Sequence, residues 1–447
     1  MKTSELQAQE VCFDQVCETL FSALTNGEDL NINLIGEKSF FLRLNNAKVR
    51  QTTDVEDGFL TLMYARDQRA HDYHLPFTGD LDTDLGHCQM ALSLLRERTP
   101  HLPVDPFYVS PKNHGSSMEN HPGQLLPADQ VPAALLAPAQ GLDLTGLYAS
   151  GVIYRANRNH TGQRHWFATE HSAFDYSLMA ANEKTVKDCF ASKHWNPEYY
   201  RERMQDSRQQ LTAMTRPSRT IEPGSYRVYL APAAVAAILE LLAGSAFSES
   251  AFRQGRSPLA NLRHGQRLSP LLNLRENFAL GGTTRFNAIG ELAPEQLDLL
   301  RAGEIANNLV SVRTAEELGL ISNAADFSES CRAPEILPGQ LPRAQILEKL
   351  GTGLYLSNLH YLNWSDVPKA RLTGMTRFAC FWVENGEIRA PIENLRFDDS
   401  VFDFLGPHLE GLTDFQEYQP DVGTYFHRQL GGALVPGLLT GKMTFTL

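Results

Sequence analysis

The sequence lacks three features that place many proteins in a class at once. Its longest mostly apolar stretch, residues 228–243, is shorter than the roughly 20 residues that span a bilayer. Its 6 cysteines lie far apart and include no CxxC pair, so they indicate neither a disulfide framework nor a zinc ribbon. Basic residues are scarce, because 40 Lys and Arg stand against 52 Asp and Glu, which gives a net charge of −12. This balance argues against binding to nucleic acid or to an anionic membrane.

Targeting and nucleotide-binding motifs are absent too. The first residues, MKTSELQAQE, contain no apolar segment of the kind that a secretory signal peptide has. With the scattered cysteines, this start leads us to expect a cytoplasmic location. The sequence has no P-loop, no GxGxxG and no GxSxG motif, so we expect neither a phosphate cradle nor a serine-hydrolase elbow.

The chain does have the composition of a globular protein. It has 447 residues, 42% of them hydrophobic and 21% charged, and this length favours two domains. Strand-like and helix-like segments without regular β–α alternation predict an α+β fold. We expect an N-terminal mixed domain with antiparallel strands over residues 1–220 and a mostly antiparallel β domain with short helices over residues 221–447. A proline-rich connector is expected at about residues 100–140, because 8 of the 24 prolines fall there.

Hydrophobic periodicity locates several elements within these halves. Apolar residues at helical spacing predict helices at residues 4–26, 84–98, 196–215 and 235–245. Alternating or β-rich segments predict strands at residues 30–34, 40–44, 165–169, 174–179 and 226–230.

The most distinctive segment lies at residues 377–388. Its first part alternates as a strand does, with apolar side chains on both faces. Asn385 and Gly386 supply a tight turn that needs positive φ, and Ile388 opens a return strand. The pattern predicts a β-hairpin.

The hairpin sequence RFACFWVENGEI, followed by PIE, resembles the SRG-x-x-G-x-W-I-E-N-G-E-I…P-V-E segment of the TldD/PmbA proteins, once called modulators of DNA gyrase. Further matches follow the family's order at residues 285–290, 302–305, 315–320 and 351–355. The resemblance covers residues 225–447 and extends over the first half through the order of its elements. It implies a relation to metallopeptidases, and hence to proteolysis and peptide maturation.

The sequence departs from this family at the metal motif. The resemblance implies an H-E-x-x-x-H helix whose histidines bind the metal and whose glutamate activates water. A gap-free alignment places Glu240 at the first histidine, Leu241 at the glutamate and Ser245 at the second histidine. The family's third ligand, a cysteine, would fall around residues 425–432, where this chain has none. We therefore expect no metal site, no catalytic residue and no cofactor in this chain, as in the TldE/PmbA-type subunit.

Three functions remain open at this point. The first is a non-catalytic subunit that pairs with a zinc-bearing TldD-type subunit acting on unfolded peptides. The second is a stand-alone peptide-binding pseudoenzyme that forms a homodimer. The third is a hydrolase with an unrecognised site. The resemblance implies a dimer, homomeric or heteromeric.

Other reactive side chains give no clear constellation. His160, His165 and His171 have a spacing that fits neither a helical nor a strand pair of zinc ligands, so we interpret them as surface and edge histidines. Cys380 lies in the hairpin strand, and a buried cysteine usually acts as a small hydrophobe rather than as a nucleophile.

A peptide site is expected at the strand that opens the hairpin. Peptides often add a strand to an exposed sheet edge, and an arginine there could hold a carboxylate. The alternative is a central strand that is paired on both sides, because an alternating pattern does not distinguish edge from centre. The candidate peptide-binding residues are Thr376, Arg377, Phe378, Ala379, Cys380 and Phe381.

Overall fold

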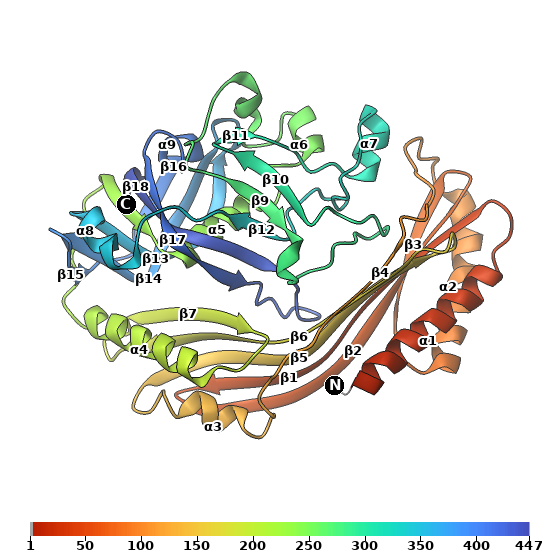
Figure 1. Ribbon diagram of the computed structural model, residues 1–447, viewed down its shortest axis with the longest axis horizontal. Coiled ribbons are helices and arrows are strands. Elements are labelled where there is room, and N and C mark those ends of the chain that lie inside the picture. Colours follow the sequence, from red (N-terminus) through yellow and green to blue (C-terminus); the bar gives the residue numbers. More distant parts are fainter. Residues whose placement is uncertain (1–2, 447) are drawn as a thin grey trace.

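Two β-sheets organise the chain in this computed structural model, which describes residues 3–446. The N-terminal sheet is seven-stranded, and the C-terminal sheet is eleven-stranded. Figure 1 shows the N-terminal sheet as a long curved layer with α1 and α2 on its outer side and the C-terminal part on its inner side. The predicted α+β fold class is confirmed.

The N-terminal sheet has the order β3-β2-β1-β5-β6-β4, with β7 paired to β6. Its pairings are antiparallel except for the parallel pair β4–β6. The strands are β1 (Glu28–Asn45), β2 (Lys48–Arg66), β3 (Arg69–Pro76), β4 (Ser116–His121), β5 (Asp143–Asn159), β6 (Arg164–Met179) and β7 (Thr185–Ser192). The helices of this part are α1 (Thr3–Ser22), α2 (Leu81–Arg98), α3 (Val131–Leu136) and α4 (Pro197–Met214).

The outer face of this sheet forms a hydrophobic core with α1 and α2. Phe13, Val16 and Leu20 of α1 are fully buried at helical spacing. They belong to one cluster with alternating residues of β1 and with Tyr154 and Trp166, whose rings stack at 5.6 Å. The opposite, inner face of the same strands is therefore free to carry polar side chains toward the C-terminal part.

The C-terminal sheet has the order β11-β10-β9-β12-β18-β16-β14-β13-β8, with β15 on β14 and β17 on β18. The pairs β12–β18 and β13–β8 are parallel, so this sheet is mixed. The strands are β8 (Gly224–Leu230), β9 (Leu274–Asn277), β10 (Gln296–Arg301), β11 (Glu304–Ile305), β12 (Pro334–Ile336), β13 (Gly353–Asp366), β14 (Arg371–Glu384), β15 (Glu387–Pro391), β16 (Arg396–Ser400), β17 (Leu409–Pro420) and β18 (Gly432–Phe445). The helices are α5 (Pro232–Ala243), α6 (Glu249–Arg253), α7 (Val312–Leu318), α8 (Ile346–Leu350) and α9 (Val401–Phe404).

The predicted hairpin is confirmed as β14–β15. Its turn has φ of 53° at Asn385 and 77° at Gly386, as a two-residue turn with positive φ requires. Several expected strands are wrong in extent, because the separate segments 30–34 and 40–44 belong to one continuous β1, and 165–169 and 174–179 to one β6. No helix among residues 3–446 is long and apolar enough to cross a membrane.

Candidate functional site

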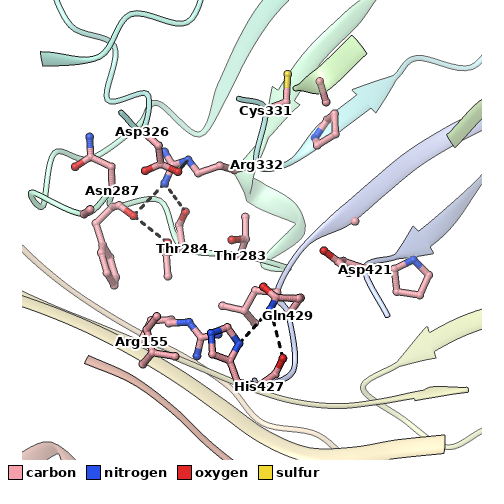
Figure 2. Close-up of a pocket in the computed structure, with 18 of the residues that line it drawn as sticks. Arg155, Thr283, Thr284, Asn287, Asp326, Cys331, Arg332, Asp421, His427 and Gln429 are labelled. Carbon is pink, nitrogen blue, oxygen red and sulfur yellow. Dashed lines mark hydrogen bonds and ion pairs between the residues drawn. The ribbon is translucent and has the colours of Figure 1, made fainter. Parts of the chain in front are cut away.

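A cleft of about 910 Å³ lies between the inner face of the N-terminal sheet and the C-terminal part. Its walls come from β1, β2, β3 and β5 on one side, and from α5 and three loops of the C-terminal part on the other. Figure 2 shows Arg155 and His427 beside the N-terminal sheet, with Asn287, Asp326 and Arg332 across the cavity. The volume lies near the upper end of the about 300–1,000 Å³ that is typical of ligand pockets.

The face of helix α5 that lines this cleft carries almost only small side chains. Every residue of α5 that lines the cavity except one is an alanine, at helical spacing, and the set is Ala233, Ala236, Ala237, Glu240 and Ala243. The opposite face, with Val235 and Leu239, is buried in the C-terminal core. The helix begins at Pro232, where a missing N–H is harmless, and the small side chains leave the cleft wide.

The loop after α7 is fastened to the end of this helix. The Cys331 N–H donates to the Ala243 carbonyl at 2.9 Å, and the Ser330 hydroxyl donates to the Gly244 carbonyl at 2.9 Å. Arg332 then holds the neighbouring loop, because its guanidinium donates to the carbonyls of Phe286 at 3.0 Å and Ala324 at 2.9 Å. These bonds fix the wall of the cleft that faces the N-terminal sheet.

One contact between the two halves centres on a single backbone carbonyl, and we call this carbonyl with its three amide donors the Ala288 clamp. The Ala288 oxygen accepts hydrogen bonds from the side-chain amides of Asn31, Asn33 and Asn157, at 2.9, 2.8 and 3.1 Å. The Gln163 amide adds a bond of 3.0 Å to the carbonyl of Ile289, the next residue. A loop of the C-terminal part is thereby held against β1 and β5 at the edge of the cleft.

A buried charged cluster adds a second connection. The Glu37 carboxylate accepts hydrogen bonds from the backbone N–H of Arg428 at 3.0 Å and from the Ser39 hydroxyl at 2.6 Å. The Arg428 carbonyl in turn accepts from the Arg155 guanidinium at 3.4 Å. Burial lowers the pKa of Arg155 and of Arg428 to about 10, although Glu37 acts in the opposite direction. The cluster joins β1 and β5 to the loop between β17 and β18.

Comparisons with known proteins now give the family. A family model described as the PmbA/TldA metallopeptidase C-terminal domain matches residues 223–447. The chain belongs to the PmbA/TldD family. No curated protein sequence matches it.

Solved structures show the same fold over nearly the whole chain. A protein named as a modulator of DNA gyrase from Thermotoga maritima has a TM-score of 0.77 at 18% identity, covering 97% of this chain and 100% of its own. TldE from Thermococcus kodakarensis has a TM-score of 0.78 at 12% identity, over 98% and 100%. A modulator of DNA gyrase from Bacteroides thetaiotaomicron has 0.75 at 14%, over 98% of both chains. Identities this low establish the shared fold alone.

The metal that a metallopeptidase family implies does not fit the donors of this PmbA/TldD chain. Glu240 is exposed and lines the cleft, Leu241 packs partly into the hydrophobic core, and Ser245 lies beyond the end of α5. Across residues 3–446 no three His, Cys, Asp or Glu side chains gather in a way that could hold a metal ion. Glu240 is the one carboxylate on the alanine-lined face of α5. A single ligand provides neither the four protein ligands of a structural zinc site nor the three of a catalytic one.

The histidines that the sequence singled out have separate roles. His165 is buried, not on the surface as expected, and its ring stacks on Phe286 at 5.2 Å. Burial lowers the pKa of His165 to about 4 and that of His171 to about 3, so both rings are neutral at physiological pH. The His160 ring lies 3.5 Å from the Asp29 carboxylate. The structure does not bring the three rings together.

Cys380 is 2% exposed and belongs to the C-terminal hydrophobic cluster. Burial raises the pKa of its thiol, although hydrogen bonds from the surrounding backbone oppose the shift. A protonated, buried thiol is a poor nucleophile. Cys331 lines the cleft. Burial and the nearby Glu276 carboxylate raise the pKa of its thiol well above the usual value.

The expected edge strand is an interior one, which corrects the basis of the peptide-site prediction. β14 pairs with β13 on one side and with β15 and β16 on the other. Between these partners the Thr376 N–H donates to the Leu395 carbonyl, and the Cys380 carbonyl accepts from the Ile392 N–H. Ala379 and Phe381 are buried between the two halves, so no strand can add at this position. The alternating sequence fits a central strand equally well.

The amides of the Ala288 clamp were missed by sequence reasoning. A signal was present, because Asn31 and Asn33 alternate with Leu30, Ile32 and Leu34 along one strand. Two amides on the same strand face, opposite a buried apolar face, indicate a polar contact surface. Nothing in the sequence indicated that the contact would be the loop at residues 285–290.

Proposed function

We propose that this chain is a non-catalytic, TldE/PmbA-like subunit that holds unfolded peptides in its central cleft for a metal-bearing TldD-type partner. The observation that carries the proposal is the cleft of about 910 Å³ beside α5, the helix on which the resemblance would place the metal motif at Glu240, Leu241 and Ser245. The substrate space of a peptidase is kept, whereas the donors for zinc are replaced. We further propose residues 1–220 and 221–447 as its two domains.

The lining of the cleft suits an extended peptide. Alanines on α5 leave room for side chains, while Asp326 and Gln429 offer hydrogen-bonding groups from the opposite loops. Such groups can bind a peptide backbone whatever its sequence. Phe327, which is 54% exposed, adds an apolar surface at the cleft.

Two aromatic residues near the cleft support pairing with another subunit. Tyr425 and Phe426 are 87% and 89% exposed, in the loop between β17 and β18 whose neighbouring residues Val422 and His427 line the cavity. Adjacent large apolar side chains in solvent usually mark an interaction surface. A partner that covers this loop would close the cleft and place its own metal beside the bound peptide.

The proposal is tested by the binding of an unstructured fluorescent peptide to the purified chain, read as anisotropy. Ala237→Arg introduces a long side chain on the cleft face of α5 and should abolish binding. Ala8→Arg is the matched control, because Ala8 is an exposed alanine of α1 far from the cleft. We expect the control to bind as the parent does, and neither protein to cleave the peptide.

The pairing is tested by adding a TldD-type chain with an intact H-E-x-x-x-H helix. We expect co-elution, and faster hydrolysis than with that chain alone. Binding that survives Ala237→Arg would contradict the cleft assignment. Peptide binding without any co-elution would instead support the stand-alone binding protein.

A further inference from the structure

A second, smaller cavity of about 250 Å³ opens beside the central cleft. The two share Pro420 and Asp421 in their walls, so they lie next to each other. The volume is below the about 300–1,000 Å³ of most drug-sized sites and suits a single amino-acid residue or a small acid. We call this cavity the annex, and it is formed around Thr169, His171, Lys193, Gly281, Tyr418 and Asp421.

The annex contains an ammonium group, that of Lys193. Lys193 follows β7 and donates a hydrogen bond of 3.3 Å to the Gly281 carbonyl. Burial lowers the pKa of this ammonium, and no carboxylate among residues 3–446 forms an ion pair with it. Asp421 is in the same wall, but its Oδ1 accepts the Gly423 N–H at 2.8 Å within its own loop. A half-buried cation of this kind favours an anionic ligand.

Two further groups of the annex can hydrogen-bond to such a ligand. Thr169 is 2% exposed, and its Oγ1 has no hydrogen-bond partner within the described chain. An unpaired buried hydroxyl is unfavourable, and a ligand oxygen would satisfy it. Burial lowers the pKa of His171 to about 3, so the neutral ring offers a nitrogen without adding charge.

We propose that the annex binds a carboxylate, held by the Lys193 ammonium and the Thr169 hydroxyl. The carboxylate can belong to a free small acid or to the C-terminus of a peptide in the cleft. Binding of a peptide C-terminus rests on the proposed function, whereas binding of a free small acid does not. With the C-terminus of a peptide in the annex, the rest of the peptide would extend past Pro420 and Asp421 into the cleft.

The test compares three probes by titration calorimetry: N-acetylglycine, a short unstructured peptide with a free C-terminus, and the same peptide as its C-terminal amide. We expect the free-acid peptide to bind at least about tenfold more tightly than the amide, as a charge-assisted hydrogen bond provides. Lys193→Gln should remove this difference. Lys48→Gln is the matched control, since Lys48 is exposed in β2 and its loss changes the net charge equally.

Thr169→Val separates binding from folding. The isosteric valine removes the unpaired hydroxyl, so we expect a smaller acid-to-amide ratio with unchanged or increased resistance to urea. Equal binding of acid and amide that Ala237→Arg abolishes would overturn the annex and leave the proposed function standing. Lys193-dependent binding of N-acetylglycine without peptide binding would support the annex and contradict the proposed function. A ratio that persists in Lys193→Gln would also overturn the annex.

Discussion

Replacing Gly290 by alanine tests whether the Ala288 clamp holds the two halves together. Gly290 has a φ of 83°, and a Cβ at this position would overlap the Gln163 side-chain amide and lie 2.5 Å from Asn157 Oδ1. Gln163 cannot turn away freely, because it is fully buried and its amide bonds Asn157 and the Ile289 carbonyl. The added methyl group must therefore push the loop off the N-terminal sheet.

The expected loss of stability has two parts. An alanine with positive φ costs about 1–2 kcal/mol, from the contact between its Cβ and the backbone. The two broken hydrogen bonds of Gln163 add about 0.5–1.5 kcal/mol each. We expect Gly290→Ala to lower the free energy of unfolding by roughly 2–5 kcal/mol.

The assay is a urea titration followed by tryptophan fluorescence and circular dichroism. Gly27→Ala is the matched control, because Gly27 has the same φ of 83° but no atom within 4 Å of its Cβ position. It should lose only the conformational part, about 1–2 kcal/mol. Equal losses in the two variants would refute the reasoning, since they would show that the Gln163 contacts beside the Ala288 clamp contribute nothing to stability.

Three further predictions concern buried positions. Ala379→Pro should lower the free energy of unfolding by about 1–3 kcal/mol, which a urea titration measures, because Ala379 is fully buried in an interior strand and the larger ring has to displace its neighbours. Glu37→Ala should lower the free energy of unfolding by about 1–3 kcal/mol for each donor that it leaves unsatisfied, which are the backbone N–H of buried Arg428 and the Ser39 hydroxyl. Burial alone would raise the pKa of Glu28, but the bound Arg96 guanidinium and other donors hold that pKa at about 2, against 4.5 for a free glutamate side chain. Above pH 4.5 the depressed pKa contributes about 3 kcal/mol to the free energy of unfolding, and this contribution is lost as the pH falls through 2. The difference in stability between the parent and Glu28→Gln should therefore narrow from pH 5 toward pH 2.

Local features of the fold were predictable because they depend on short stretches of sequence. The hairpin turn at Asn385 and Gly386 follows from residues that tolerate positive φ, and α5 follows from apolar residues at helical spacing. The lengths of β1 and β6 were not predictable. Gly36 interrupts the apolar pattern of β1, yet the strand continues because this glycine leaves room for the Tyr154 ring.

The site was less predictable because its walls come from distant parts of the chain. Asn31 and Ala288 are 257 residues apart in sequence but share a hydrogen bond. The family resemblance correctly indicated the chain's family, and it directed attention to Glu240, which does line the cleft. Neither resemblance nor periodicity could show that the strand at residues 376–381 lies inside the sheet, since pairing partners are set by the tertiary fold.

The central claim, that this PmbA/TldD chain carries no peptidase metal of its own, is tested most directly by its zinc content. The chain is purified, dialysed against a mild chelator and measured by mass spectrometry of the elements. We predict far less than one zinc per chain, because Glu240 is the single donor left on an alanine-lined helix face. Near-equimolar zinc that is lost in Glu240→Ala would contradict the account.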